Sequence, residues 1–269
     1  MSSPSTASSR DKKPRVVAIV EARMGSTRLP GKSLRLILGK PTLALLLERL
    51  GRSTMLDGIV VATTALPEDD AIEALCHRVS MQCFRGSSED VLDRVARAAQ
   101  WQKAGVVVEI TGDCPLTCPE VIDEAVRRFL AGGMDYLSNL LIQSYPQAID
   151  VRVFRTADLV EINGQLAGDD PALREHVALY FEEHPEKYQT HVMAAPPEYH
   201  RPDWRLDLDY PEDLLLLTRI FEALYPRNPA FTLQELIDCL DAHPEWRTIN
   251  AHMVRRPARP AGSDARAVA

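Results

Sequence analysis

Short apolar runs alternate with amphipathic stretches along the first half of the chain. The clearest apolar runs occupy residues 16–20, 58–62 and 106–110, and further strands are predicted at 81–84 and 135–138. Apolar runs of this length are typical of strands that are buried on both faces of a parallel sheet. Their regular alternation with helical stretches predicts an α/β fold, with a mostly parallel central sheet and helices on both faces.

Between these strands, apolar side chains recur every three or four residues, which is the spacing of one helix face. The first helix is predicted over residues 41–52, with Pro41 at its start. The second begins at 67–70, where acidic side chains favour a helix N-terminus. Its predicted apolar face consists of Ala71, Leu75 and Val79. Two more helices are expected, one with an apolar stripe between residues 91 and 99 and one over 119–130.

The alternation loosens after residue 138. Residues 139–200 are interpreted as a smaller excursion that forms the acceptor side of a site or a dimer surface. Within and after it, strands are predicted at 148–154, 190–195 and 204–208, and helices at 156–164, 171–183, 212–224 and 233–241. We expect a single domain over residues 15–254, preceded by a disordered leader at 1–14 and followed by a disordered tail at 255–269.

Composition narrows the class of protein. The chain has 269 residues, a formal net charge of −7 and 45% hydrophobic residues. The negative charge argues against nucleic acid as a partner, and no apolar run is long enough to cross a membrane. The five cysteines lack a C-x-x-C pair, so reduced thiols and a cytoplasmic location are predicted.

The first strand runs directly into a basic, glycine-rich loop at residues 22–32. Arg23, Arg28 and Lys32 provide charge, and Gly25 and Gly31 allow backbone N–H groups to approach an anion. This composition predicts a phosphate cradle at the carboxyl end of the strand. It is not a P-loop, because five residues separate the two glycines where that motif has four, and the dinucleotide fingerprint G-x-G-x-x-G is absent.

Acidic residues follow two other predicted strands. Asp113 comes after the strand at 106–110, where it is either a Mg²⁺ ligand or the N-cap of the helix at 119–130. Asp207 and Asp209 share one face by strand alternation. They form either a cation site or a helix cap beside a solvent-facing carboxylate. The spacing alone leaves both alternatives open.

The string ARMGSTRLPGK at 22–32, followed by Gly39-Lys40-Pro41, resembles the nucleotide-binding loop of the SpsF-like cytidylyltransferases, which are related to the CMP-KDO synthetases. Further motifs of that family follow in order. They lie at residues 61–64 with 67–70, 84–94, 110–115, 174–177 and 209–214. The resemblance extends over roughly residues 16–214 and implies a nucleotidyltransferase fold of the GT-A-like, Rossmann-like type.

The resemblance also implies a function and a set of site residues. The expected reaction transfers CMP from CTP to a sugar, with acidic sugars among the candidates, and releases pyrophosphate; a homodimer is expected. Asp113 and Asp209 would hold Mg²⁺, and Arg23 and Lys32 would act with them in catalysis on the triphosphate. The implied nucleotide-binding residues are Ala22, Arg23, Met24, Gly25, Ser26, Arg28, Lys32, Thr63, Thr64 and Gly112. The acceptor-binding candidates are Arg85, Tyr145, Arg174, His176 and Asp207.

The chain departs from the family pattern at several positions. Glu21 stands where Gln is common, Glu109 where Arg is common, and Asp207 where Thr is usual, while residues 145–148 replace Tyr-Pro-Asp-Gly. Two other functions therefore stay open. One is a GT-A glycosyltransferase that uses Asp207-Leu208-Asp209 as its D-x-D motif, and the other is a nucleotide-binding homologue without catalysis.

Overall fold

The structure is a computed structural model that describes residues 13–166, 170–253 and 258–259. Most of the predicted leader (residues 1–12) and of the predicted tail (254–257 and 260–269) lies outside the described residues. In the described part of the chain, no helix has the length and apolar character needed to cross a membrane.

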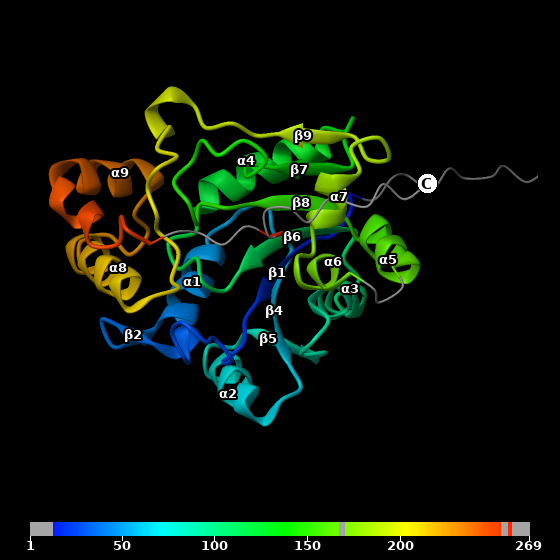
Figure 1. The fold of residues 1–269 in the computed structure, drawn as a ribbon, viewed down its shortest axis with the longest axis horizontal. Coiled ribbons are helices and arrows are strands. Elements are labelled where there is room, and N and C mark those ends of the chain that lie inside the picture. Colours follow the sequence, from blue (N-terminus) through cyan, green and yellow to red (C-terminus); the bar gives the residue numbers. More distant parts are fainter. Residues whose placement is uncertain (1–12, 167–169, 254–257, 260–269) are drawn as a thin grey trace, which may run out of the picture.

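One seven-stranded sheet organises the chain, in the order β5-β4-β1-β6-β8-β7-β9 (Figure 1). The first four strands of this order run parallel, β8 is antiparallel to both of its neighbours, and β9 is parallel to β7. The strands are β1 Val16–Glu21, β4 Gly58–Thr64, β5 Gln82–Gly86, β6 Val106–Thr111, β7 Tyr136–Ser138, β8 Arg152–Arg155 and β9 Thr190–Val192. The predicted mostly parallel sheet is confirmed.

Helices cover both faces of this sheet because alternate strand residues point to opposite sides. Val16, Ala18 and Val20 of β1 pack in one core with α1, α2, α4, α8 and α9, while Val17 and Ile19 pack in a second core with α3, α5, α6 and α7. The helices are α1 Thr42–Leu50, α2 Asp70–Arg78, α3 Val91–Trp101, α4 Pro119–Leu130, α5 Thr156–Gln165, α6 Pro171–Glu175, α7 Leu179–Glu183, α8 Pro211–Leu224 and α9 Leu233–Ala242.

Short elements fill the connections. Four 3₁₀ turns lie at η1 Lys32–Leu34, η2 Pro67–Asp69, η3 Pro197–Tyr199 and η4 Pro244–Thr248, and a small two-stranded sheet pairs β2 Leu36–Ile37 with β3 Lys40–Pro41. Because α2 ends at Arg78, Val79 leaves the predicted helix face and is 40% exposed.

The single helix predicted over residues 171–183 is wrong. It is divided into α6 and α7, with His176 in an extended conformation between them (φ −108°, ψ 96°). The cause is burial, because Val177 to Phe181 are five consecutive buried residues. One side of a continuous helix cannot bury five consecutive side chains.

The strand predicted at 204–208 is also wrong. In the described part of the chain this segment makes a single isolated bridge, between Gln147 and Arg205, and joins no sheet. The strands predicted at 148–154 and 190–195 are shorter than expected. Ala148 has a positive φ of 77°, so strand β8 starts only at Arg152.

The two strands that matter most for the site end side by side. β1 pairs with β6 in register, with Glu21 opposite Thr111, and Gly112 N–H donates to the Glu21 carbonyl at 2.8 Å. A Cβ added at Gly112 would lie 2.6 Å from that carbonyl oxygen and 3.0 Å from the Ala22 Cβ. Only glycine allows the turn after β6 to approach the loop after β1 this closely.

We therefore predict that Gly112→Ala lowers the free energy of unfolding by about 1–3 kcal/mol, the usual cost of overpacking. The control is Gly164→Ala in α5, where the added Cβ meets no atom within 4 Å outside its own stretch of helix. It should be neutral or raise stability by up to about 1 kcal/mol. Urea unfolding of both variants measures the difference, and equal effects would contradict the close-approach argument.

Candidate functional site

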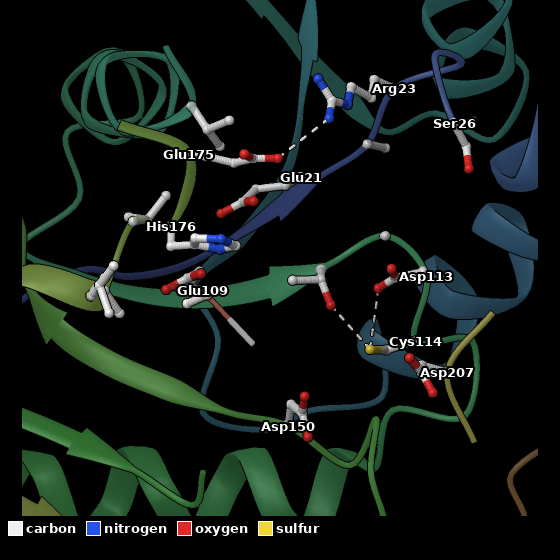
Figure 2. Close-up of a pocket in the computed structure, with 18 of the residues that line it drawn as sticks. Glu21, Arg23, Ser26, Glu109, Asp113, Cys114, Asp150, Glu175, His176 and Asp207 are labelled. Carbon is white, nitrogen blue, oxygen red and sulfur yellow. Dashed lines mark hydrogen bonds and ion pairs between the residues drawn. The ribbon is translucent and has the colours of Figure 1, made fainter. Parts of the chain in front are cut away.

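A cavity of about 880 Å³ opens at the carboxyl ends of β1 and β6. Its walls include parts of four segments, at residues 21–33, 109–114, 170–179 and 207–209. Figure 2 shows Glu21, His176 and Glu109 gathered toward one end, and Asp113 and Asp207 toward the other. We call the first the glutamate end. The second, which also holds Lys32 and Asp209, is the lysine end.

The loop after β1 is held in place by a buried carboxylate. Asp69, which is fully buried, accepts a hydrogen bond from Met24 N–H at 2.7 Å and one from the Thr64 hydroxyl. Gly31 closes the loop with a φ of 66° and donates to the Met24 carbonyl at 3.2 Å. The basic loop is therefore fixed before any ligand binds.

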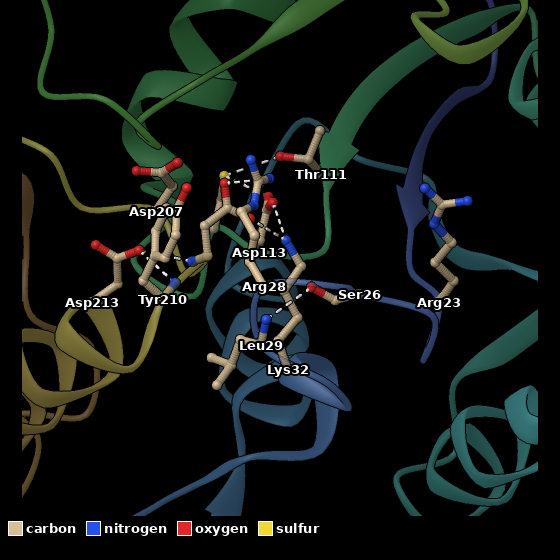
Figure 3. Close-up of polar contacts among 12 residues, drawn as sticks. Arg23, Ser26, Arg28, Leu29, Lys32, Thr111, Asp113, Asp207, Tyr210 and Asp213 are labelled. Atoms are coloured by element: carbon tan, nitrogen blue, oxygen red, sulfur yellow. Dashed lines mark hydrogen bonds and ion pairs between the residues drawn. The ribbon is translucent and has the colours of Figure 1, made fainter. Parts of the chain in front are cut away.

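At the lysine end, one ammonium group joins two carboxylates. Lys32 Nζ lies 2.7 Å from Asp113 Oδ2 and 2.7 Å from Asp209 Oδ1, and Arg28 lies 2.8 Å from Asp209 Oδ2. Figure 3 shows Lys32 and Arg28 of the loop close to Asp113, which comes from a different segment. Lys32 and Arg28 therefore meet the two aspartates at one edge of the sheet, whereas Arg23, the other cation predicted to act with them, lies 3.7 Å from Glu175.

At the lysine end, the ion pairs shift the pKa values of Asp113 and Lys32 more than burial does. Burial would raise the pKa of Asp113, but the Lys32 charge, hydrogen bonds from Lys32 and the Thr111 hydroxyl lower it to about 2. Burial would lower the pKa of Lys32, but Asp113 and Asp209 raise it. Both groups are therefore charged at neutral pH, as an ionic site for phosphate or a cation requires.

Neither Asp113 nor Asp209 caps a helix. The N-cap of α4 is Cys118, and the N-terminus of α8 is satisfied by Asp213, which accepts from Asp209 N–H at 2.9 Å and from Tyr210 N–H at 2.8 Å. Leu208 N–H donates to the Asp113 carbonyl at 2.9 Å, which ties the two acidic segments together. The capping alternatives are therefore excluded, and both carboxylates make their side-chain contacts with the cations of the loop.

Asp207 shares a guanidinium with its neighbours. Arg205 lies 3.2 Å from Asp207 and is held by two contacts of 3.1 Å to Asp213. Burial raises the pKa of Asp207 to about 7, with Asp113 and Asp209 adding to the rise and Arg205 opposing it. Its Oδ1 is buried without a hydrogen-bond partner among the described residues. Arg205 is thus divided between Asp207 and Asp213, so Asp207 is only partly compensated.

The donor set at the lysine end fits Mg²⁺. In the described residues, no group of three or more His, Cys, Asp or Glu side chains could hold a metal ion by itself. Mg²⁺ bound with nucleotides, however, is usually held by one or two carboxylates together with phosphate oxygens and water. Asp113 and Asp209 supply two hard oxygen ligands beside the phosphate loop, which is the chemistry that such an ion requires.

The glutamate end is a buried cluster of acids and arginines. Glu109 is 4% exposed and lies 3.3 Å from Arg152 of β8, which in turn lies 3.8 Å from Glu182. Burial, followed by the charge of Glu109, raises the pKa of Glu21, while Arg94 and Arg152 oppose the rise. Burial also raises the pKa of Glu109, against Arg152.

Most of the loop and turn residues predicted for the nucleotide line the cavity. They are Ala22, Arg23, Gly25, Ser26, Arg28, Lys32 and Gly112, and the acceptor candidates His176 and Asp207 line it as well. Met24, Thr63 and Thr64 are not among the described lining residues. Thr64 acts on the loop through Asp69, and Thr63 is fully buried.

Three acceptor candidates lie elsewhere. Arg85 pairs with Asp70 at 2.5 Å and Glu73 at 2.9 Å on α2. Arg174 contacts Asp90 at 3.2 Å and Asn163 at 2.6 Å, and Tyr145 is a core residue at 6% exposure. None of the three is among the described lining residues of the cavity, and each contacts other parts of the fold.

Several residues of the site were not among the predicted site residues. Asp69, Arg205 and Asp213 position the groups that face the cavity. Glu21, Glu109, Asp150, Arg152 and Glu182 line it directly. Arg259, a described residue of the predicted tail, pairs with Asp170 at 2.8 Å at the cavity wall. For Glu21 and Glu109, the available signals were their places at strand ends and their departure from the family pattern.

An α/β sheet with a basic loop and a carboxylate pair at its carboxyl edge defines a nucleotide-binding class of protein. Comparison with known proteins specifies it further. The model of the cytidylyltransferase family matches residues 17–235, and the chain belongs to this family.

Individual relatives agree with that assignment. The spore coat polysaccharide biosynthesis protein SpsF of Bacillus subtilis is 34% identical over 237 residues, which covers 87% of this chain and 97% of SpsF. A 3-deoxy-manno-octulosonate cytidylyltransferase of Pelobacter propionicus is 35% identical over 117 residues, 43% of this chain and 44% of that protein. The structure of a cytidylyltransferase from Leptospira borgpetersenii has a TM-score of 0.82 and 28% identity and covers 91% of this chain and 100% of that one.

Removal of the Lys32 charge should destabilise the folded protein, because Asp113 and Asp209 then repel each other without a cation between them. We predict that Lys32→Met lowers the free energy of unfolding by about 1–3 kcal/mol without ligand, because two partly buried carboxylates lose their shared partner. Lys40→Met is the matched control, since Lys40 is 46% exposed and pairs with Glu48 at the surface. It should change stability by at most about 1 kcal/mol. Chemical denaturation at pH 7 distinguishes the two.

Stability should fall with rising pH because of the glutamate end. Above the usual glutamate pKa of 4.5, the folded protein keeps protons on Glu21 and Glu109 that the unfolded chain has lost. The free energy of unfolding therefore decreases as the pH rises toward the raised pKa values. The loss is about 1.4 kcal/mol for each tenfold difference in proton affinity between the folded and unfolded states. The charged groups that face the two glutamates are Arg94, Arg152, Asp150 and Glu182, with His176 in the same wall.

Glu109→Gln should flatten this dependence, so its gain in stability over the wild type should be larger at pH 8 than at pH 5. Unfolding curves collected between pH 5 and pH 9 measure the slope. A variant with the same slope as the wild type would show that Glu109 does not hold its proton.

Proposed function

We propose that this cytidylyltransferase transfers CMP from CTP to a hydroxyl of a sugar that serves polysaccharide biosynthesis. The observation that carries the proposal is the contact of Lys32, on the phosphate loop, with both Asp113 and Asp209 at 2.7 Å. The relative SpsF acts, by its name, in polysaccharide biosynthesis, and the partial relative is named a sugar-acid cytidylyltransferase. Both names support a sugar acceptor.

In the proposed reaction, the sugar hydroxyl oxygen attacks the α-phosphorus of CTP in line. A new P–O bond forms, the bond to the β-phosphate breaks with its electron pair leaving on pyrophosphate, and the hydroxyl proton passes to solvent. Reactions of this kind depend mainly on positioning and charge neutralisation. The cavity walls supply both.

The loop residues hold the triphosphate. Gly25 and Ser26 line the cavity with their backbone held by the Asp69 contact, and Arg23 and Arg28 face the same space. Fixed donors and cations of this kind stabilise the charge that develops on a departing pyrophosphate.

Asp113 and Asp209 would hold Mg²⁺, which supplies charge neutralisation at the phosphate oxygens when it is bound. With the carboxylates so engaged, the Lys32 ammonium would turn from them to a phosphate oxygen. Asp207 is paired with Arg205, and the family assignment argues against the glycosyltransferase alternative that used Asp207 in a D-x-D motif. Homodimerisation stays a prediction.

Asp113→Asn is the central test. We expect pyrophosphate release from CTP and a sugar panel to fall at least about a thousandfold, because several kcal/mol of stabilisation at the phosphates is lost. Circular dichroism should show an intact fold. Asp238→Asn on the surface of α9 is the matched control and should keep full turnover.

Chelation by EDTA should abolish turnover of the wild type, and added Mg²⁺ should restore it. Turnover of Asp113→Asn at the wild-type rate would contradict the assignment. CTP binding without pyrophosphate release from any acceptor would favour the alternative of a nucleotide-binding homologue without catalysis.

A further inference from the structure

Two cysteines lie on neighbouring elements at one edge of the sheet. Cys76 belongs to α2, Cys83 belongs to the edge strand β5, and a short turn joins the two elements. Figure 1 shows α2 beside β5. At the end of the turn, Met81 N–H donates to the Cys76 carbonyl at 2.8 Å. This hydrogen bond brings the chain back along the helix, so β5 starts next to the last turn of α2.

Ion pairs show which faces of α2 and β5 meet. Arg85 of β5 lies 2.9 Å from Glu73 and 2.5 Å from Asp70, which are both on α2. Cys83 precedes Arg85 by two residues and therefore shares its face of the strand. Cys76 follows Glu73 by three residues and therefore shares its face of the helix. The two cysteines thus face each other across the same packed interface as the ion pair.

The two side chains also make a direct contact. A side-chain hydrogen bond joins the thiol groups of Cys76 and Cys83. Cys76 is fully buried, and Cys83 is partly buried against the same core. A disulfide requires an S–S distance of about 2 Å. Because Arg85 already holds the strand on the helix, two sulfur atoms in hydrogen-bond contact have little distance left to close.

The two thiols are chemically unequal. The hydrogen bond from Cys76 lowers the pKa of Cys83, and the charge of Arg85 adds to this effect, against burial and Glu73. The same hydrogen bond, followed by burial, raises the pKa of Cys76. Thiolates are the reactive form of cysteine. Cys83, which is also the more exposed of the two, is therefore the nucleophile, and Cys76 is a protonated thiol beside it.

The other cysteines of the chain have different surroundings. The structure describes all five cysteines. Burial raises the pKa of Cys114, Cys118 and Cys239. The Cys114 thiol contacts the carboxylate of the adjoining aspartate, and the Cys118 thiol donates to a backbone carbonyl. A lowered pKa and a neighbouring thiol therefore occur together at Cys83.

We propose that Cys76 and Cys83 form a redox-sensitive dithiol, which closes to a disulfide when a hydroperoxide oxidises Cys83. In the first step, the Cys83 thiolate sulfur attacks an oxygen of hydrogen peroxide. An S–O bond forms, the O–O bond breaks, and the departing hydroxide takes up a proton and becomes water. Cys83 is then a sulfenic acid.

In the second step, the Cys76 sulfur attacks the sulfenic sulfur of Cys83. An S–S bond forms, the S–O bond breaks, and the hydroxyl group leaves as water with the proton of the Cys76 thiol. The two thiols lose two electrons in total, and one peroxide molecule takes them up. A thiol reductant reverses the reaction by thiol–disulfide exchange.

The position of Cys76 has a chemical consequence. A sulfenic acid without a neighbouring thiol is oxidised further to a sulfinic acid, which thiols do not reduce. Cys76 replaces this irreversible product by a reversible disulfide. Neither cysteine is among the described lining residues of the cavity, so the proposal is independent of the transfer of CMP.

The first experiment maps the oxidised thiols of the full chain. The reduced protein is treated with hydrogen peroxide, its remaining thiols are alkylated, and it is digested with trypsin, which separates the two cysteines by cleavage after Arg78. We expect the Cys76 and Cys83 peptides to be joined, the intact protein to lose two hydrogen atoms, and dithiothreitol to restore both thiols. A disulfide between other cysteines, a link between two chains, or sulfinic acid at Cys83 as the main product overturns the proposal.

The second experiment compares Cys76→Ser and Cys83→Ser with Cys239→Ser, a control that removes a thiol elsewhere. In Cys76→Ser, Cys83 should gain two oxygen atoms as a sulfinic acid that dithiothreitol does not remove. In Cys83→Ser, Cys76 should stay reduced, and Cys239→Ser should form the disulfide at the wild-type rate. Oxidation of Cys76 in Cys83→Ser as fast as in the wild type would contradict the role of Cys83 as nucleophile. The wild-type peptide map decides whether the disulfide forms even if a variant fails to fold by circular dichroism.

Discussion

The contact of the Lys32 ammonium with Asp113 and Asp209 is the interaction on which the rest of the site depends. The two aspartates are 81 and 177 residues away from Lys32 along the chain. They meet because β1 and β6 end at one edge of the sheet and because the segment before α8 hydrogen-bonds back to Asp113. Gathering carboxylates in a partly buried place is unfavourable unless cations are gathered with them. The basic loop is thus a structural counter-ion as well as a candidate phosphate site.

A second set of acids acts on the backbone and not on a ligand. Asp69 fixes the loop after β1 through Met24 N–H, and Asp213 fixes the segment before α8 through the N–H groups of Asp209 and Tyr210. Both carboxylates are fully buried. Hydrogen bonds from buried N–H groups to a carboxylate are stronger than neutral ones. The two flanks of the lysine end are therefore rigid before ligands bind, which reduces the entropy lost on binding.

The strands and helices up to β7 follow the local pattern closely, because burial on both faces gives an apolar run and burial on one face gives a helical period. The pattern was misleading where tertiary packing decided the structure. Residues 171–183 divide into two helices because Val177 to Phe181 are all buried. Residues 204–208 stay outside the sheet, where they make one isolated bridge and a hydrogen bond to the Asp113 carbonyl. The site shows the same division. The meeting of Lys32 with Asp113 and Asp209 could be predicted, since ligands of open α/β sheets bind where strands end. The pairing of Arg85 and Arg174 with residues outside the cavity could not be predicted, because their partners on other elements become neighbours only after packing.

The buried carboxyl groups are compensated differently at the two ends of the cavity. At the lysine end, Lys32, Arg28 and Arg205 stand between Asp113, Asp207 and Asp209, so the protein supplies most of the compensating charge. At the glutamate end, Arg152 is shared between Glu109 and Glu182, and Glu21 Oε1 has no hydrogen-bond partner among the described residues. A buried acid without a compensating positive charge either keeps its proton or binds a cation. Because burial raises the pKa values of Glu21 and Glu109, the glutamate end keeps protons where the lysine end keeps ion pairs.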